Sequence, residues 1–213
     1  QDSDWTDGAN PGQKTIFSES RCKMNSGFSV DAKVDMALGL TAALNIRPLV
    51  GWRVQRFSFT TYDGIQFEVG QQPFPLPGNG IEFRQTFYHY YIGGIFRRTL
   101  GASRMLPSLP LVDVSIQGDY GMVTAGNEDL HLLRSGHRVT QDNTRGHSWH
   151  ANIQLGFLYT QSLRARLEAD LLRIVSHGSH RLTNPVQFVD FSFDGSRVWS
   201  DQASFTVTGE LIF

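Results

Sequence analysis

Two short pairs of ionisable residues have the types and spacing that hydrolytic chemistry needs. Asp2 and Asp4 lie near the start of the chain, and Asp129 and His131 lie in the run GNEDLHLL. In an extended backbone, residues two apart point their side chains the same way. His131 could act as a general base that Asp129 orients, while Asp2 and Asp4 hold the attacking water. Such short patterns are more often solvated turns, so the prediction depends on the fold.

The composition fits one domain without a disulfide framework. The chain has 213 residues, 19 Lys and Arg against 20 Asp and Glu, and one cysteine, Cys22. The balanced charge gives no support for nucleic-acid binding, and a single cysteine excludes an internal disulfide or a cysteine-based zinc cluster. No segment approaches the roughly 20 apolar residues of a membrane helix. If the protein spans a membrane, it does so with strands.

Apolar and polar residues alternate along much of the chain. Every even position from Phe28 to Leu40 is apolar, whereas the odd positions between them are mostly polar. This period of two is typical of a strand with one apolar face. It recurs in 111–124, 149–159, 163–171 and 201–213, and the aromatic-rich segments 45–60 and 81–97 also fit strands. Seven strands without a helical period predict an all-β protein.

Alternation does not say which face of the strands is wet. The apolar face points inward in a soluble barrel or sandwich and toward lipid in an outer-membrane barrel. Strand length, the alternation of tight and long connections, and aromatic residues near strand ends all favour an antiparallel transmembrane β-barrel. The long connections are 61–80, 125–146 and 178–199, and the aromatic residues are Trp52, Tyr120, Trp149, Tyr159 and the terminal Phe213.

Counting strands backward from Phe213 predicts which connections share an end of the barrel. With Phe213 on the periplasmic side, the long connections and segment 1–27 lie outside, so Asp2, Asp4, Asp129 and His131 share the outer rim. Bacterial single-chain barrels have an even number of strands. We therefore expect residues 1–213 to be one barrel domain whose N-terminal strands are missing.

The motifs DSDWTDGANPG, GWRVQRFSF, FRQTFYHYYIGG and GNEDLH, in this order, resemble those of the omptin family. Omptins are ten-stranded outer-membrane proteases of Gram-negative bacteria. The resemblance implies polypeptide substrates and an active site that faces outside the cell. It also implies that Asp2, Asp4, Asp129 and His131 flank a water that attacks the peptide bond, without a metal, another cofactor or a covalent intermediate.

Omptins also need lipopolysaccharide, which binds the outer face of the barrel. The resemblance implies that Arg56, with Trp52 nearby, binds this activating lipid. Arg56 lies on the apolar phase, where an arginine costs roughly 2 to 4 kcal/mol at the bilayer midplane and much less near the interface. A phosphate partner would explain it. The alternative is an interfacial arginine without a specific lipid.

The chain departs from the family pattern beside the expected catalytic pair. Asn127 stands where the family commonly has an acidic residue that reads a basic substrate side chain. Glu128 is adjacent but would point the other way in an extended strand. We take both as candidate substrate-binding residues and leave the cleavage preference open. Leu130 and Thr86 replace a Glu and a basic lipid-binding residue of the family.

Two other classes of protein fit parts of the pattern. A non-catalytic outer-membrane barrel, such as an adhesin or a porin-like structural protein, would keep the scaffold without the activity. A soluble binding domain would bury the apolar face instead. The histidine spacings match no zinc motif, and the sequence contains no phosphate-binding loop or serine-nucleophile elbow.

Overall fold

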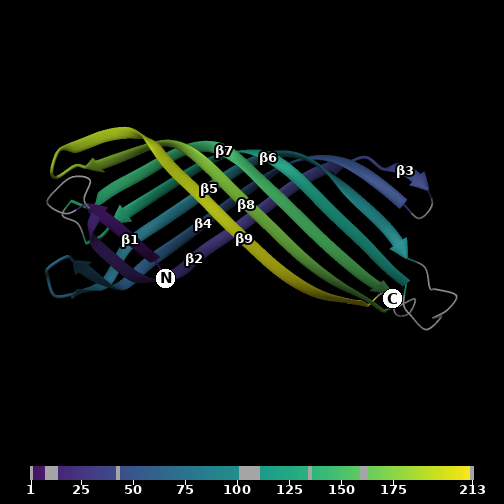
Figure 1. The fold of residues 1–213 in the computed structure, drawn as a ribbon, viewed down its shortest axis with the longest axis horizontal. Helices are drawn as coiled ribbons and strands as arrows, with labels where there is room; N and C mark the ends of the chain where they lie inside the picture. The colour runs from purple at the N-terminus through teal and green to yellow at the C-terminus, as the bar shows by residue number, and fades with distance from the viewer. Residues whose placement is uncertain are drawn as a thin grey trace.

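The computed structural model describes residues 2–7, 14–41, 44–100, 111–133, 136–158 and 163–211, with side chains from residue 15 onward except at 39–41, 44 and 111. The regular structure in these ranges is β-strand (Figure 1). The strands are β1 (Asp2–Asp7), β2 (Lys14–Asp35), β3 (Leu38–Thr41), β4 (Leu44–Glu68), β5 (Phe74–Leu100), β6 (Leu111–His131), β7 (Arg138–Leu158), β8 (Leu163–Asn184) and β9 (Val189–Leu211).

All nine strands belong to one antiparallel sheet. Its order is β1-β2-β4-β5-β6-β7-β8-β9, and the short β3 pairs with β4. Apart from the short β3, each strand therefore pairs with the strands that precede and follow it in the sequence, as in an up-and-down barrel. Within the described ranges β1 and β9 do not pair with each other, so the sheet is open. The all-β prediction and all seven predicted strands are confirmed.

The strands are longer than the alternating segments predicted. The seven long strands contain 21 to 27 residues. The three connections expected to be long loops are mostly strand, and only residues 69–73, 132–137 and 185–188 lie between the ends of successive strands. Segment 1–27, expected as an outer connection, contains β1 and the first part of β2. The alternation of apolar and polar residues ends where both faces of a strand meet water. The backbone hydrogen bonds between neighbouring strands continue beyond that point.

The two faces of the sheet have the opposite polarity to those of a soluble protein. Large apolar side chains are exposed on the outer face, while charged and polar side chains are buried on the inner face. This is the polarity of a barrel whose outer face contacts lipid. The exposed set includes Val30, Tyr90, Ile92, Trp149, Ile153 and Phe205, and the buried set includes Arg53, Gln55, His89, Asp119, His150 and Asn152. The described residues form no helix that could cross a membrane.

Two layers of side chains pack on the inner face below the hairpin ends. An apolar cluster joins four strands through Phe87, Val123, Ala125, Leu172, Ile174 and Val198. Beyond it lies a polar layer, in which the ring nitrogens of His150 lie 2.6 Å from Asp119 Oδ2 and 2.7 Å from Asp170 Oδ2. Arg53 donates to Asp31 Oδ2 over 2.7 Å in the same layer. These contacts hold the strands that carry the residues at the rim.

The β4–β5, β6–β7 and β8–β9 connections lie at one end of the molecule, the hairpin end. In Figure 1 the β4–β5 and β8–β9 turns and the start of β7 lie on the left with β1, while β9 ends on the right. The parity argument is confirmed in this respect, since the three predicted long connections do share an end. Tyr159 and the terminal Phe213 lie outside the described residues.

Candidate functional site

Asp129 and His131 are among the last residues of β6, at the hairpin end. The expectation that they follow the strand was wrong, because β6 runs to His131 instead of ending near 124. Odd positions of β6 such as Val123 and Ala125 are buried on the inner face. Asn127, Asp129 and His131 continue this inner row, since alternate residues of a strand share a face. The structure therefore presents the predicted Asp-x-His pair toward the inside of the barrel.

Neighbouring strands fix the backbone of this pair. Asp129 lies between Phe83 of β5 and Thr140 of β7, and Thr140 Oγ1 donates to Asp129 Oδ2 over 3.3 Å. A backbone hydrogen bond from Leu132 N to Gly80 O, 2.9 Å long, extends the ladder past His131. His131 is thus held at the rim by pairing on both sides instead of lying in a loop.

Asp2 and Asp4 lie in β1, at the same end of the sheet as the hairpin turns (Figure 1). They pair in register with Ser20 and Ser18 of β2. Three strands, β2, β4 and β5, separate β1 from β6 along the sheet. The structure describes only the backbone of β1, so the expected approach of Asp2 and Asp4 to the Asp-x-His pair stays a prediction.

The two candidate substrate-binding residues face opposite sides of β6. Asn127 lies on the inner face, and its Oδ1 is buried without a hydrogen-bond partner. Glu128 lies on the outer face, 3.5 Å from Arg84 Nη1, and accepts a hydrogen bond from Gln141 Nε2 over 3.1 Å. The structure therefore brings Asn127, but not Glu128, to the side of Asp129 and His131.

Three residues that sequence reasoning missed gather beside Asn127 on the inner face. Asp142 of β7 is the register partner of both Asn127 and His180. Asp142 Oδ1 accepts hydrogen bonds from His180 Nδ1 over 2.9 Å and from Ser196 Oγ over 2.7 Å. No alternation marks these residues, because they lie in strand segments that are polar on both faces.

A bulge in β9 completes this group. Gly178 pairs with Ser196 and Ser179 with Asp194, which leaves Gly195 as an extra residue with a φ of 105°. Glycine adopts this left-handed conformation without the steric cost that other residues meet. The bulge lets Ser196 reach Asp142 while Phe193, three residues away, packs its ring 4.9 Å from the His180 ring. In the sequence, the only sign of this bulge is the glycine at position 195.

The tip of the β8–β9 hairpin is joined by an ion pair. Arg181 Nε and Nη2 donate to the two carboxylate oxygens of Asp190 over 3.0 and 2.7 Å. The Arg181 guanidinium lowers the pKa of the Asp190 carboxyl. Both side chains are exposed to solvent, so this ion pair links β8 to β9 but contributes little to the free energy of unfolding.

Arg56 lies on the outer face, as its phase predicted. It is exposed and borders a hollow of about 350 Å³ between β4 and β7. Its register partner is Thr86, and Trp52 lies four residues along β4 on the same face. The other side chains at this hollow are polar or charged and include Arg84, Glu128, Gln141 and Asn143.

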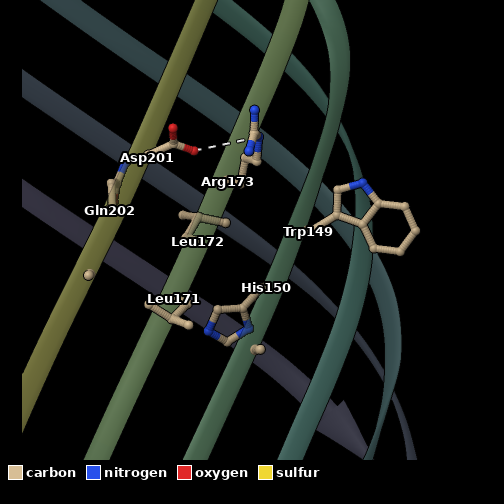
Figure 2. A pocket seen from close by; sticks show the side chains of 9 residues that line it. Trp149, His150, Leu171, Leu172, Arg173, Asp201 and Gln202 are labelled. Carbon is tan, nitrogen blue, oxygen red and sulfur yellow. Dashed lines mark ion pairs between the residues drawn. The ribbon is translucent and has the colours of Figure 1, made fainter.

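A second hollow, of about 430 Å³, lies over β7, β8 and β9 (Figure 2). Trp149, Leu171 and the small side chain of Ala203 border it. Arg173 Nε lies 3.6 Å from Asp201 Oδ1 at this hollow, which Figure 2 marks with a dashed line. Because Trp149 and Leu171 belong to the apolar outer face, this hollow is separate from the inner site.

Comparison with known proteins shows the family of the chain. The model of the omptin family matches residues 1–185. The solved structure of the outer membrane protease OmpT from Escherichia coli aligns with a TM-score of 0.74 and 16% sequence identity, over 99% of this chain and 72% of that chain. A comparison with curated protein sequences found no match. The structural likeness shows a shared barrel fold, and the family match shows that the chain belongs to the omptin family of outer-membrane proteins.

Proposed function

We propose that this protein is an outer-membrane endopeptidase of the aspartic, omptin type. It cleaves polypeptides with a water activated by Asp129 and His131 and held by Asp2 and Asp4. The observation that carries the proposal is the position of Asp129 and His131, which share the inner face of β6 at the hairpin end of an omptin-type sheet. Membership of a family of outer-membrane proteases supports the reaction class.

Each side chain has a role in the proposed reaction. His131 takes a proton from the water as the water oxygen attacks the carbonyl carbon, and then passes that proton to the leaving amine. Asp129 orients the imidazole and stabilises its charged form, while the hydrogen bond from Thr140 Oγ1 fixes the carboxylate. Asp2 and Asp4 accept hydrogen bonds from the water. No covalent intermediate forms and no metal or other cofactor takes part.

The proposal places the hairpin end outside the cell and includes lipopolysaccharide as an activator. Arg145, His177 and Arg197 are consecutive cross-strand neighbours on the outer face of β7, β8 and β9. They lie next to the row that holds Trp199, on its hairpin side. Neither these three side chains nor Arg56 has an ion-pair partner among the described residues. The unpaired guanidinium groups of Arg56, Arg145 and Arg197 at the edge of an apolar surface favour phosphate groups, and lipopolysaccharide in the outer leaflet of a Gram-negative outer membrane carries them.

Replacement of His131 tests the reaction. Loss of a general base typically costs about 10²- to 10⁴-fold in rate, so His131→Ala should lower kcat of the full-length protein with lipopolysaccharide by that order. A fluorescence-quenched peptide library reports the cleavage. His137→Ala is the matched control, because His137 is exposed in the β6–β7 turn. Cleavage that survives His131→Ala contradicts the mechanism, and a wild-type protein without cleavage favours the non-catalytic adhesin or porin-like barrel.

A further inference from the structure

A hollow of about 360 Å³ lies between β5 and β8, at the end of the sheet opposite the hairpin end. Three of the side chains that border it are arginines, namely Arg97, Arg164 and Arg166. Among the described residues at this hollow, Asp113 is the single acid. The arginine hollow, as we call it, therefore carries net positive charge.

Alternation places these arginines on the inner face of the sheet. Odd positions of β5 such as Ile95 are buried on the inner face, and Arg97 continues this row. Even positions of β8 such as Leu172 are buried on the same face, and Arg164 and Arg166 continue that row. The arginine hollow is thus part of the barrel interior, separate from the outer face that contacts lipid.

Small side chains on the two middle strands make room between the arginines. Arg97 is the register partner of Ser115 in β6, and Arg166 is the register partner of Gly156 in β7. A Cβ built at Gly156 would meet only atoms of Asp113, the nearest at 3.6 Å. Arginines on the flanking strands therefore border an open space above a serine and a glycine.

The charges of these arginines are poorly compensated within the protein. Neither Arg97 nor Arg166 has an ion-pair partner among the described residues. Arg164 Nη1 lies 3.9 Å from Glu210 Oε2, and both side chains are partly exposed, so this ion pair is weak. Two guanidinium groups thus keep their N–H donors available for a ligand.

Two acids near the arginine hollow are engaged by neutral side chains. Asp113 Oδ1 accepts a hydrogen bond from Thr99 Oγ1 over 2.6 Å. Glu168 lies two residues from Arg166 on the same face of β8, and its Oε1 accepts from Asn152 Nδ2 over 2.7 Å. These hydrogen bonds hold both carboxylates to neighbouring strands instead of to the arginines.

The donors at the arginine hollow suit a tetrahedral oxyanion. An arginine fork binds phosphate through two parallel hydrogen bonds. Guanidinium groups from β5 and β8 approach a shared ligand from different sides, while Ser115 and Gln154 offer neutral donors between them. A phosphate presents oxygens in four directions, whereas a carboxylate presents one edge. Phosphate can therefore engage more of these donors at once.

We propose that Arg97, Arg164 and Arg166 form a phosphate-binding site at the mouth of the barrel opposite the proposed active site. With the hairpin end outside the cell, this mouth opens to the periplasm. The site takes inorganic phosphate or the phosphate group of a small phosphomonoester. It goes beyond the endopeptidase function and does not depend on peptide cleavage.

Titration calorimetry of the full-length protein in a phosphate-free detergent tests the site. Inorganic phosphate at constant ionic strength should bind saturably, whereas acetate should not. Arg97→Gln and Arg166→Gln should each weaken phosphate binding about 10-fold or more, because each removes a charge-assisted hydrogen bond. Arg98→Gln is the matched control, since Arg98 adjoins Arg97 on the outer face of β5, and it should leave the affinity unchanged.

The two arginine variants lie on different strands, so one remains informative if the other fails to fold, which tryptophan fluorescence reports. Glycerol 3-phosphate separates the two sources of the ligand: tighter binding than inorganic phosphate assigns the site to a phosphomonoester, and weaker binding assigns it to free phosphate. The proposal is overturned if the wild-type protein shows no saturable phosphate binding, if acetate binds equally well, or if both arginine variants keep the wild-type affinity.

Discussion

At the scale of single residues, neighbours decide what an ionisable side chain can do. Asp129 and Asp142 are both aspartates on the inner face near the rim. Thr140 donates one hydrogen bond to Asp129, whereas His180 and Ser196 both donate to one oxygen of Asp142. The sequence predicted the first aspartate through its spacing to His131, but the partners of the second come from other strands. The sequence identified Asn127 as a departure from the family pattern. It did not predict that Asn127 Oδ1 would be buried without a hydrogen-bond partner.

The lipopolysaccharide proposal is tested at Arg56. Its side chain borders the outer hollow without an ion pair among the described residues, so a lipid phosphate is its expected partner. Arg56→Ala should require at least about 10-fold more lipopolysaccharide for half-maximal activity, since a charge-assisted hydrogen bond contributes about 1.5–3 kcal/mol. Titration of lipopolysaccharide against peptide cleavage measures this.

Arg181→Ala serves as the control for Arg56→Ala, because its guanidinium is already engaged by Asp190. The same lipopolysaccharide requirement in Arg56→Ala and the wild type would remove Arg56 from the lipid site.

At the scale of elements, alternation located every long strand but not the strand ends. The segments that alternate match the parts of β2 and β4–β9 whose outer face is apolar. Beyond them the strands continue toward the hairpin turns with polar residues on both faces, so period-two hydrophobicity disappears while backbone pairing persists. The β9 bulge at Gly195 escaped prediction for a related reason, because a bulge changes register without changing composition.

Close strand approach in β7 and β8 depends on two glycines. A Cβ at Gly146 would lie 2.0 Å from Val175 O, and one at Gly178 would lie 2.1 Å from Asn143 O. Backbone atoms in a paired strand cannot give way easily, so Gly146→Ala and Gly178→Ala should each destabilise the barrel by about 1–3 kcal/mol. Urea unfolding of the refolded protein in lipid vesicles, followed by tryptophan fluorescence, measures the loss.

Gly118→Ala is the control for these variants, because nothing lies within 4 Å of a Cβ built there. It should change stability by less than about 0.5 kcal/mol. Equal stability of all three alanine variants would show that the strands can separate locally at no cost.

At the scale of the whole molecule, the inverted polarity of the sheet defines its environment. The outer face carries an apolar band with aromatic residues such as Tyr120 and Trp149, whose ring centroids lie 4.6 Å apart. The inner face carries the His150 network and the apolar cluster around Phe87. A sheet built this way is stable where lipid covers its outside, which agrees with the omptin family match.

Ile153 tests where the lipid lies. It is 47% exposed on the outer face of β7, five residues from the end at Leu158. Ile153→Arg should destabilise the folded protein in vesicles by about 2–4 kcal/mol, the cost of an arginine near the bilayer midplane. Gln141→Arg, on the same face of β7 near the hairpin turn, should cost about 0–1 kcal/mol. Equal costs measured by urea unfolding would place both positions in the same environment.

By itself, the sequence determined the strand type, the number of long strands, the inner and outer phases and the Asp-x-His pair, because these follow from the order of residues along one strand. Only the tertiary structure decided that Asp142, His180 and Ser196 meet beside Asn127. Their meeting depends on the register between β6, β7, β8 and β9 and on one extra residue at Gly195. Register is set by hydrogen bonds between strands, and a one-residue slip would turn Asp142 to the outer face.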